Sequence, residues 1–133
     1  MAGLDRGQTF IDHEATNIDC TKAKYLIALS DADDPDDRVP CFVMNTERHM
    51  HKYHFGCNKE KYRFIVKEKT FTFINNPTSI MLKVEWYYTF EELCGRSIEL
   101  LDIADDLLCR QIKNCIDWNQ MLLETREIIN KCF

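Results

Sequence analysis

Two apolar runs flank an acidic turn in KYLIALSDADDPDDRVPCFVMNT, the stretch from Lys24 to Thr46. The first run, Lys24–Ser30, is almost continuously apolar, as expected of a buried strand. The second run, Arg38–Thr46, carries Pro40 near its start, where a missing N–H is tolerated at a strand end or sheet edge. Between them, Asp31–Asp37 is dense in turn formers, and it lacks the central glycine and terminal glutamate of a calcium-binding loop. The stretch therefore predicts two strands joined by a solvated acidic hairpin.

Further strand signals fill the first two-thirds of the chain. Short runs rich in β-branched or aromatic residues predict strands at Gln8–Asp12, Tyr62–Val66 and Thr70–Ile74. Asn75–Thr78 reads as a turn or capping loop. Ser79–Phe90 alternates imperfectly and predicts one long, bent strand with a bulge.

From Glu91 onward the apolar residues follow a helical period. Asp102 is a candidate N-cap, with Asp105 and Asp106 in the first turn. The stripe then continues to Cys132, as one long helix or as two helices broken near residue 117. This tail carries more apolar surface than a small barrel needs, so we expect a helical hairpin or a partner chain to cover it. The apolar positions are Ile103, Leu107, Leu108, Ile112, Cys115, Ile116, Trp118, Met121, Leu122, Ile128, Ile129 and Cys132.

Strands first and helices last favour an α+β fold, or a small β-barrel over residues 7–96 followed by a helical segment over residues 97–133. The chain has 133 residues, of which 45% are apolar and 29% charged, so a single folded domain is expected rather than disorder. The apolar runs are too short to span a bilayer, and the first ten residues do not resemble a secretory signal. The net charge of −5 excludes long-range attraction to nucleic acid but not a local basic groove.

The cysteines indicate a reducing environment. There are seven, an odd number, and none forms a C-x-x-C pair. We therefore expect a reduced, cytoplasmic protein whose cysteines act mainly as small core residues.

A histidine-rich stretch, RHMHKYHFGC at Arg48–Cys57, follows the second strand of the acidic hairpin. In an extended segment His49 and His51 share a face, and His54 and Cys57 would return across a turn through Gly56. These are zinc-type ligands, although their spacing matches no standard structural pattern. The alternative is an exposed edge segment with a buried Phe55 and a free thiol at Cys57.

The order of the pieces resembles a known family. An apolar strand ends in LSD (Leu29–Asp31), an acidic hairpin follows, and the next strand ends in VMNT (Val43–Thr46). FTFINNPTSIML (Phe71–Leu82) and IELLDIADDLLCRQIKNCI (Ile98–Ile116) come later. Over Gly7–Ile116 the chain resembles, in a divergent form, the PemK/MazF-like family of toxin-type proteins.

This resemblance implies an SH3-like barrel with a C-terminal helix, often a homodimer, that cuts single-stranded RNA without a metal or other cofactor and binds an antitoxin. Lys24 stands where active members carry an arginine ahead of the VxS strand, and Thr46 stands at their Thr/Ser position. Gly7 and Gln8 match the family's GD signature only at the glycine, and the family's RP pair is absent. A catalytically degenerate barrel that binds partner proteins through its C-terminal helices is therefore the alternative.

Metal-independent RNA cleavage needs a base, a cation beside the phosphorane and an acid for the leaving oxygen. Lys24 or Arg48 would supply the cation, His49 or His51 the base or acid, and Thr46 a hydrogen bond to phosphate. The competing interpretation treats these as solvated strand-end and turn residues. If the histidines are catalytic, they are not metal ligands.

The most basic stretch is Asn58–Lys69, in which cations are interleaved with aromatic residues. Lys59, Lys61 and Arg63 are candidate RNA-binding residues, because lysines beside aromatics suit a single-strand groove. An ordinary amphipathic strand pair is the alternative. No membrane contact is expected.

Overall fold

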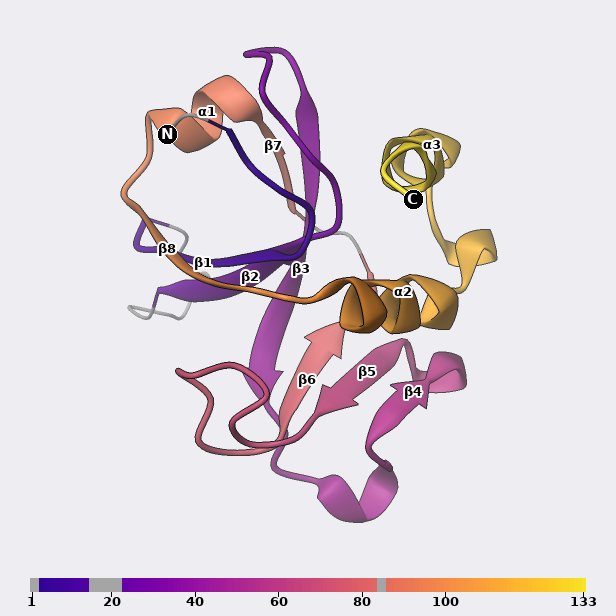
Figure 1. Ribbon diagram of the computed structural model, residues 1–133. Coiled ribbons are helices and arrows are strands. Elements are labelled where there is room, and N and C mark those ends of the chain that lie inside the picture. Colours follow the sequence, from indigo (N-terminus) through magenta and orange to yellow (C-terminus); the bar gives the residue numbers. More distant parts are fainter. Residues whose placement is uncertain (1–2, 15–22, 84–85) are drawn as a thin grey trace.

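The computed structural model describes residues 3–14, 23–83 and 86–133. Within these residues the fold is α+β, with an antiparallel sheet of eight strands and three α-helices, two of them after the last strand (Figure 1). The strands are β1 (Gln8–Asp12), β2 (Lys24–Ala28), β3 (Arg38–Thr46), β4 (Gly56–Asn58), β5 (Arg63–Val66), β6 (Thr78–Met81), β7 (Trp86–Thr89) and β8 (Ile98–Ile103). The helices are α1 (Phe90–Cys94), α2 (Asp106–Cys115) and α3 (Leu123–Lys131), with 3-10 turns η1 (Met50–Lys52), η2 (Lys59–Lys61) and η3 (Trp118–Gln120).

The sheet is organised around β3, the longest of these strands. The strand order is β4-β5-β6-β3-β2-β1-β8, and β7 also pairs with β3. Residues Arg38–Cys41 of β3 pair with β7, whereas Met44–Thr46 pair with β6. β2 lies along the other edge of β3, which confirms the pair of strands predicted around the acidic hairpin. β4 and β8 stand at opposite ends of the order, so the described strands do not close into a barrel.

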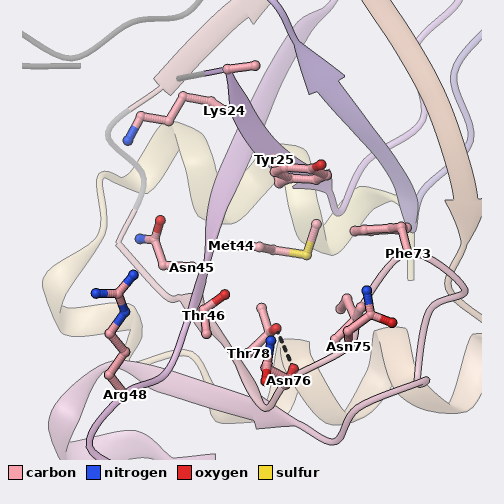
Figure 2. A pocket seen from close by; sticks show the side chains of 12 residues that line it. Lys24, Tyr25, Met44, Asn45, Thr46, Arg48, Phe73, Asn75, Asn76 and Thr78 are labelled. Atoms are coloured by element: carbon pink, nitrogen blue, oxygen red, sulfur yellow. Dashed lines mark hydrogen bonds between the residues drawn. The ribbon is translucent and has the colours of Figure 1, made fainter. Parts of the chain in front are cut away.

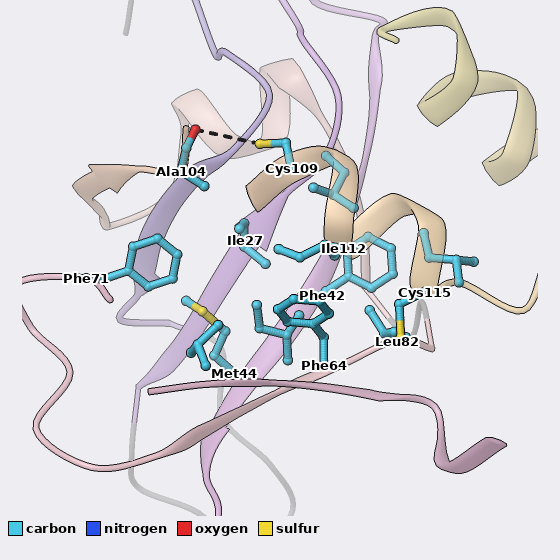
Figure 3. Close-up of a cluster of buried hydrophobic side chains, with 14 of the residues drawn as sticks. Ile27, Phe42, Met44, Phe64, Phe71, Leu82, Ala104, Cys109, Ile112 and Cys115 are labelled. Atoms are coloured by element: carbon cyan, nitrogen blue, oxygen red, sulfur yellow. Dashed lines mark hydrogen bonds between the residues drawn. The ribbon is translucent and has the colours of Figure 1, made fainter. Parts of the chain in front are cut away.

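Both faces of β2 and β3 are buried, in two separate cores. Ile27 and Phe42 belong to the first core, while their neighbours Leu26 and Val43 belong to the second. The first core is covered by α2 (Figure 3) and also includes Ile129 of α3, and the second is covered by α1 and the N-terminal segment. Because strand side chains alternate between faces, burial on both faces requires the continuous apolar runs seen in the sequence.

The C-terminal third differs from the expected helical segment. Ile98–Ile103 forms β8, which pairs with β1. Helix α2 begins only after Asp105, whose carboxylate accepts a hydrogen bond from the Leu108 amide at 2.8 Å. The prediction of Asp102 as the N-cap was wrong, because its carboxylate accepts hydrogen bonds from Thr72 instead. The chain then breaks after α2, so the tail forms two helices.

Two predicted strands also take other forms. Thr70–Ile74 is a compact loop, entered through Lys69 with a φ of 66°, and its apolar Phe71 and Ile74 are buried without strand pairing. Ser79–Phe90 divides between β6, β7 and the start of α1, and the capping box of Thr89 and Glu92 begins that helix. β4 within the histidine stretch was not predicted.

Cys57 and Cys115 form a disulfide between β4 and the last residue of α2. The expectation of reduced cysteines was wrong for this pair, because β4 lies against α2 in the fold although the two cysteines are 58 residues apart in sequence. Cys41 and Cys109 are free and buried, as expected of small core residues. Among the helices of the described residues, none has the length and apolarity required to cross a bilayer.

Candidate functional site

A cleft of about 700 Å³ opens where β2, the end of β3, the start of β6 and the loop at residues 73–76 meet (Figure 2). Three of the four residues predicted to be catalytic, Lys24, Thr46 and Arg48, line this cleft. The fourth, His49, is not among its lining residues. The structure therefore brings together residues from two strands and a turn that are up to 24 positions apart in the sequence.

Strand alternation divides the cleft into a polar side and an aromatic side. Tyr25 pairs with Met44 across β2 and β3, so their side chains share one face of the sheet. Lys24 and Asn45, each one residue away, lie on the opposite face. Figure 2 shows Lys24, Asn45 and Arg48 on one side of β3 and the Tyr25 ring on the other. A ligand in this cleft would meet both surfaces around the end of β3.

The aromatic side is built from stacked rings. Tyr25 is 40% exposed, and its ring lies 5.4 Å from that of Phe73 at an interplanar angle of 14°. Phe73 stacks in turn on Phe71, which is buried in the first core, with 5.7 Å between ring centroids. The stack holds an open aromatic ring in place, as a surface on which a flat apolar group can lie. Neither Tyr25 nor Phe73 was predicted as a site residue from the sequence, because both lie in segments that were predicted to be strands.

The charged groups that line the cleft are both positive. Lys24 and Arg48 contribute them, and none of the described residues lines the cleft with a carboxylate. Within the part of the chain that the structure describes, neither side chain has an ion-pair or hydrogen-bond partner. The cleft therefore favours an anionic group over a cationic one, although the net charge of the chain is −5.

Glu47 lies between two cleft residues in sequence but points into the protein. Its side chain is 3% exposed, and Oε2 accepts hydrogen bonds from Arg63 at 2.5 Å and from Ser79 at 2.6 Å. Oε1 accepts a hydrogen bond from the His49 amide at 3.0 Å. Burial alone would raise the pKa of Glu47, but the hydrogen bonds from Ser79, His49 and Arg63 outweigh it and lower the pKa. This anionic anchor fixes the turn that presents Arg48 to the cleft.

The predicted RNA-binding residues lie outside the cleft. Lys59 is exposed in η2. Lys61 donates a hydrogen bond to the Lys52 carbonyl at 2.6 Å, and its ammonium lies 5.1 Å from the centre of the Tyr53 ring. The Arg63 guanidinium lies 4.8 Å from the same ring centre and is also paired with Glu47. Arg63 therefore has a structural role that its sequence position did not reveal.

The histidine stretch does not gather into a metal-binding group. The rings of His49 and His51 meet edge to face at 5.9 Å, but Cys57 is bonded to Cys115 and has no thiolate to offer. Among the described residues, the one group of three or more ligand-type side chains close enough to share an ion is Asp33, Asp34 and Asp37 in the acidic hairpin. Exposed carboxylates in a turn are commonly found without a metal.

Comparison with protein-family models, curated proteins and solved structures found no significant match to this chain.

Proposed function

We propose that the cleft binds single-stranded RNA. The observation that carries the proposal is that two cations without an ion-pair partner among the described residues, Lys24 and Arg48, share one cleft with the exposed ring of Tyr25, which is stacked on Phe73. Phosphates need positive charge, and unpaired bases need an aromatic surface on which to stack. Side-chain amides such as Asn75, which also lines the cleft, can hydrogen-bond the edges of such bases.

The proposal extends to metal-independent cleavage of the bound RNA. Lys24 and Arg48 would stabilise the charge that develops on the scissile phosphate, and the Thr46 hydroxyl would hold a phosphate oxygen. His49, which follows Arg48 in the sequence but is not among the residues that line the cleft, would have to reach toward the bound RNA to move the proton, as a base or an acid. This version keeps the resemblance to the PemK/MazF-like family, with the open sheet around β3 as a form of the SH3-like barrel. It also implies a protein that needs no cofactor and works in the cytoplasm, a compartment in which a disulfide such as Cys57–Cys115 is uncommon.

Fluorescence anisotropy with a labelled single-stranded RNA tests binding, and gel analysis of the same RNA in EDTA tests cleavage. We expect the wild-type protein to bind and cut the RNA, and Lys24→Ala and Thr46→Ala to abolish cleavage. Lys131→Ala removes a matched charge from α3, outside the cleft, and should change neither result. RNA that stays unbound across a broad panel of sequences would overturn the proposal. Binding without cleavage would overturn the enzymatic version and support a degenerate barrel.

A second candidate function is protein–protein interaction, either as a homodimer or with an antitoxin-like partner. The observation that favours it is a pair of adjacent leucines before and at the start of α3, Leu122 and Leu123, which are 68% and 67% exposed. Deleting the tail is a poor test, because Ile129 of α3 is buried in the first core. Light scattering should instead show self-association that is lost in Leu122→Ser/Leu123→Ser. A wild-type protein that stays monomeric at high concentration would rule out the homodimer.

A further inference from the structure

Positive charge is concentrated in one segment next to the cleft. Residues 48–69 hold seven of the 17 lysines and arginines but only two of the 22 acidic residues, Glu60 and Glu68. The rest of the chain, with the other 20 acidic residues, is strongly negative. An anionic chain leaving the cleft would therefore be attracted along this segment and repelled elsewhere.

The pairing of the strands places Arg63 of this segment on the polar side of the cleft. Directly paired residues share a face of the sheet, and Asn45 pairs with Ser79, which pairs in turn with Ile65. Arg63, two residues before Ile65, has the same orientation. Lys24 and Asn45 therefore face the same side of the sheet as Arg63, away from the core beneath α2.

A continuous set of contacts connects the cleft to an aromatic residue on this face. Glu47, next to Arg48, holds the Arg63 guanidinium, and that guanidinium lies over the Tyr53 ring. Lys61 approaches the same partly exposed ring. Because Arg63 is anchored by a buried carboxylate, it stays in place, whereas the exposed Lys61 ammonium is held by a neutral partner, the Lys52 carbonyl, which it can leave more readily. A base that replaced Lys61 on the ring would release its ammonium to a neighbouring phosphate.

We propose that Tyr53, Lys61 and Arg63 form a second RNA subsite, in which a base of the strand leaving the cleft stacks on Tyr53 while Lys61 binds the adjacent phosphate. This inference rests on the proposed RNA cleft and adds a length requirement to it. A trinucleotide would occupy the cleft alone, whereas a single strand of about 12 nucleotides would reach both places.

Anisotropy titrations with a labelled trinucleotide and a labelled single-stranded RNA of about 12 nucleotides test the subsite. We expect the longer RNA to bind more tightly to the wild-type protein, and Tyr53→Ala to weaken the longer RNA about tenfold while leaving the trinucleotide unchanged. Tyr53→Phe should preserve the affinity because it keeps the ring. Lys61→Ala should reduce the slope of log affinity against log salt for the longer RNA by about 0.7, the value for one single-strand phosphate contact. Lys131→Ala should leave this slope unchanged.

Each result separates the subsite from the cleft. Equal wild-type affinity for the two RNAs, or equal weakening of both by Tyr53→Ala, would overturn the subsite and leave the RNA cleft intact. Failure of the wild-type protein to bind either RNA would overturn the cleft and the subsite together. A thermal melt of each variant, compared with that of Tyr53→Phe, shows whether a loss of affinity comes from unfolding.

Discussion

Removing the Cys57–Cys115 disulfide should destabilise the protein substantially. The bond closes a loop between residues 58 positions apart, and the loop-entropy relation for the unfolded chain then gives about 4 kcal/mol at 25 °C. The perturbation is Cys57→Ser/Cys115→Ala, which keeps a polar atom at the exposed position and an apolar one at the buried position. Urea unfolding under non-reducing conditions measures the difference in the free energy of unfolding.

Three further measurements show whether the loss of stability comes from the disulfide. Cys94→Ala changes an exposed, free cysteine and should leave the free energy of unfolding within about 0.5 kcal/mol of the wild type. A reductant should destabilise the wild type but not the double variant. In denaturant, thiol titration should count two more reactive thiols after reduction than before. An unchanged thiol count, or a double variant as stable as Cys94→Ala, would refute the reasoning.

The remaining predictions concern the buried carboxylates and the aromatic side of the cleft. Glu47→Gln should lower the free energy of unfolding, measured in urea, by about 2 kcal/mol. This is less than the loss on breaking a fully buried ion pair, because Arg63 is partly exposed. A loss under about 0.5 kcal/mol would contradict the anchoring role of Glu47. Burial alone would raise the pKa of Glu47 and of Asp12, but hydrogen bonds outweigh this effect and lower both pKa values on folding. Glu47 accepts these bonds from Ser79, the His49 amide and Arg63. Asp12 accepts them from Tyr88 and Arg96. Each ionised carboxylate therefore stabilises the fold above its unfolded pKa of 4.5 or 3.8, and this contribution is lost as the pH falls through the lower folded value. Melting temperatures followed downward from about pH 5 should fall less steeply in Asp12→Asn than in the wild type, and parallel curves would count against this assignment. Tyr25→Ala should weaken RNA binding about tenfold with little change in the melting temperature, because Tyr25 is already 40% exposed. Unchanged affinity would remove the aromatic side from the proposed site.

The central strands were predictable because their physical requirement is visible in the sequence. Two continuous apolar runs, Lys24–Ser30 and Arg38–Thr46, correspond to β2 and β3, which are buried on both faces. By contrast, Ile98–Ile103 is so short that the spacing of its apolar residues fits a strand or a helix equally well. The segment becomes a strand because it pairs with β1. Thr70–Ile74 has strand-like composition, but it packs its apolar residues into the core as a loop.

The candidate site was predictable only in part, for a related reason. Lys24, Thr46 and Arg48 share a cleft because they lie at adjacent ends of paired strands or just beyond them, and a hairpin prediction contains that information. Nothing local marks Glu47 as buried, because its partners Arg63 and Ser79 belong to β5 and β6. The disulfide was equally hidden, since only the contact between β4 and α2 brings its two cysteines together.

The most direct test of the proposed cleft is the affinity of Lys24→Ala/Arg48→Ala for labelled single-stranded RNA at two salt concentrations, measured beside the wild type and Lys131→Ala. If both cations bind phosphates, the double variant should bind far more weakly, and its slope of log affinity against log salt should be smaller by about 1.4. The Lys131→Ala control should keep the wild-type affinity and slope. The same affinity and slope in the double variant as in the wild type would contradict an RNA site at this cleft.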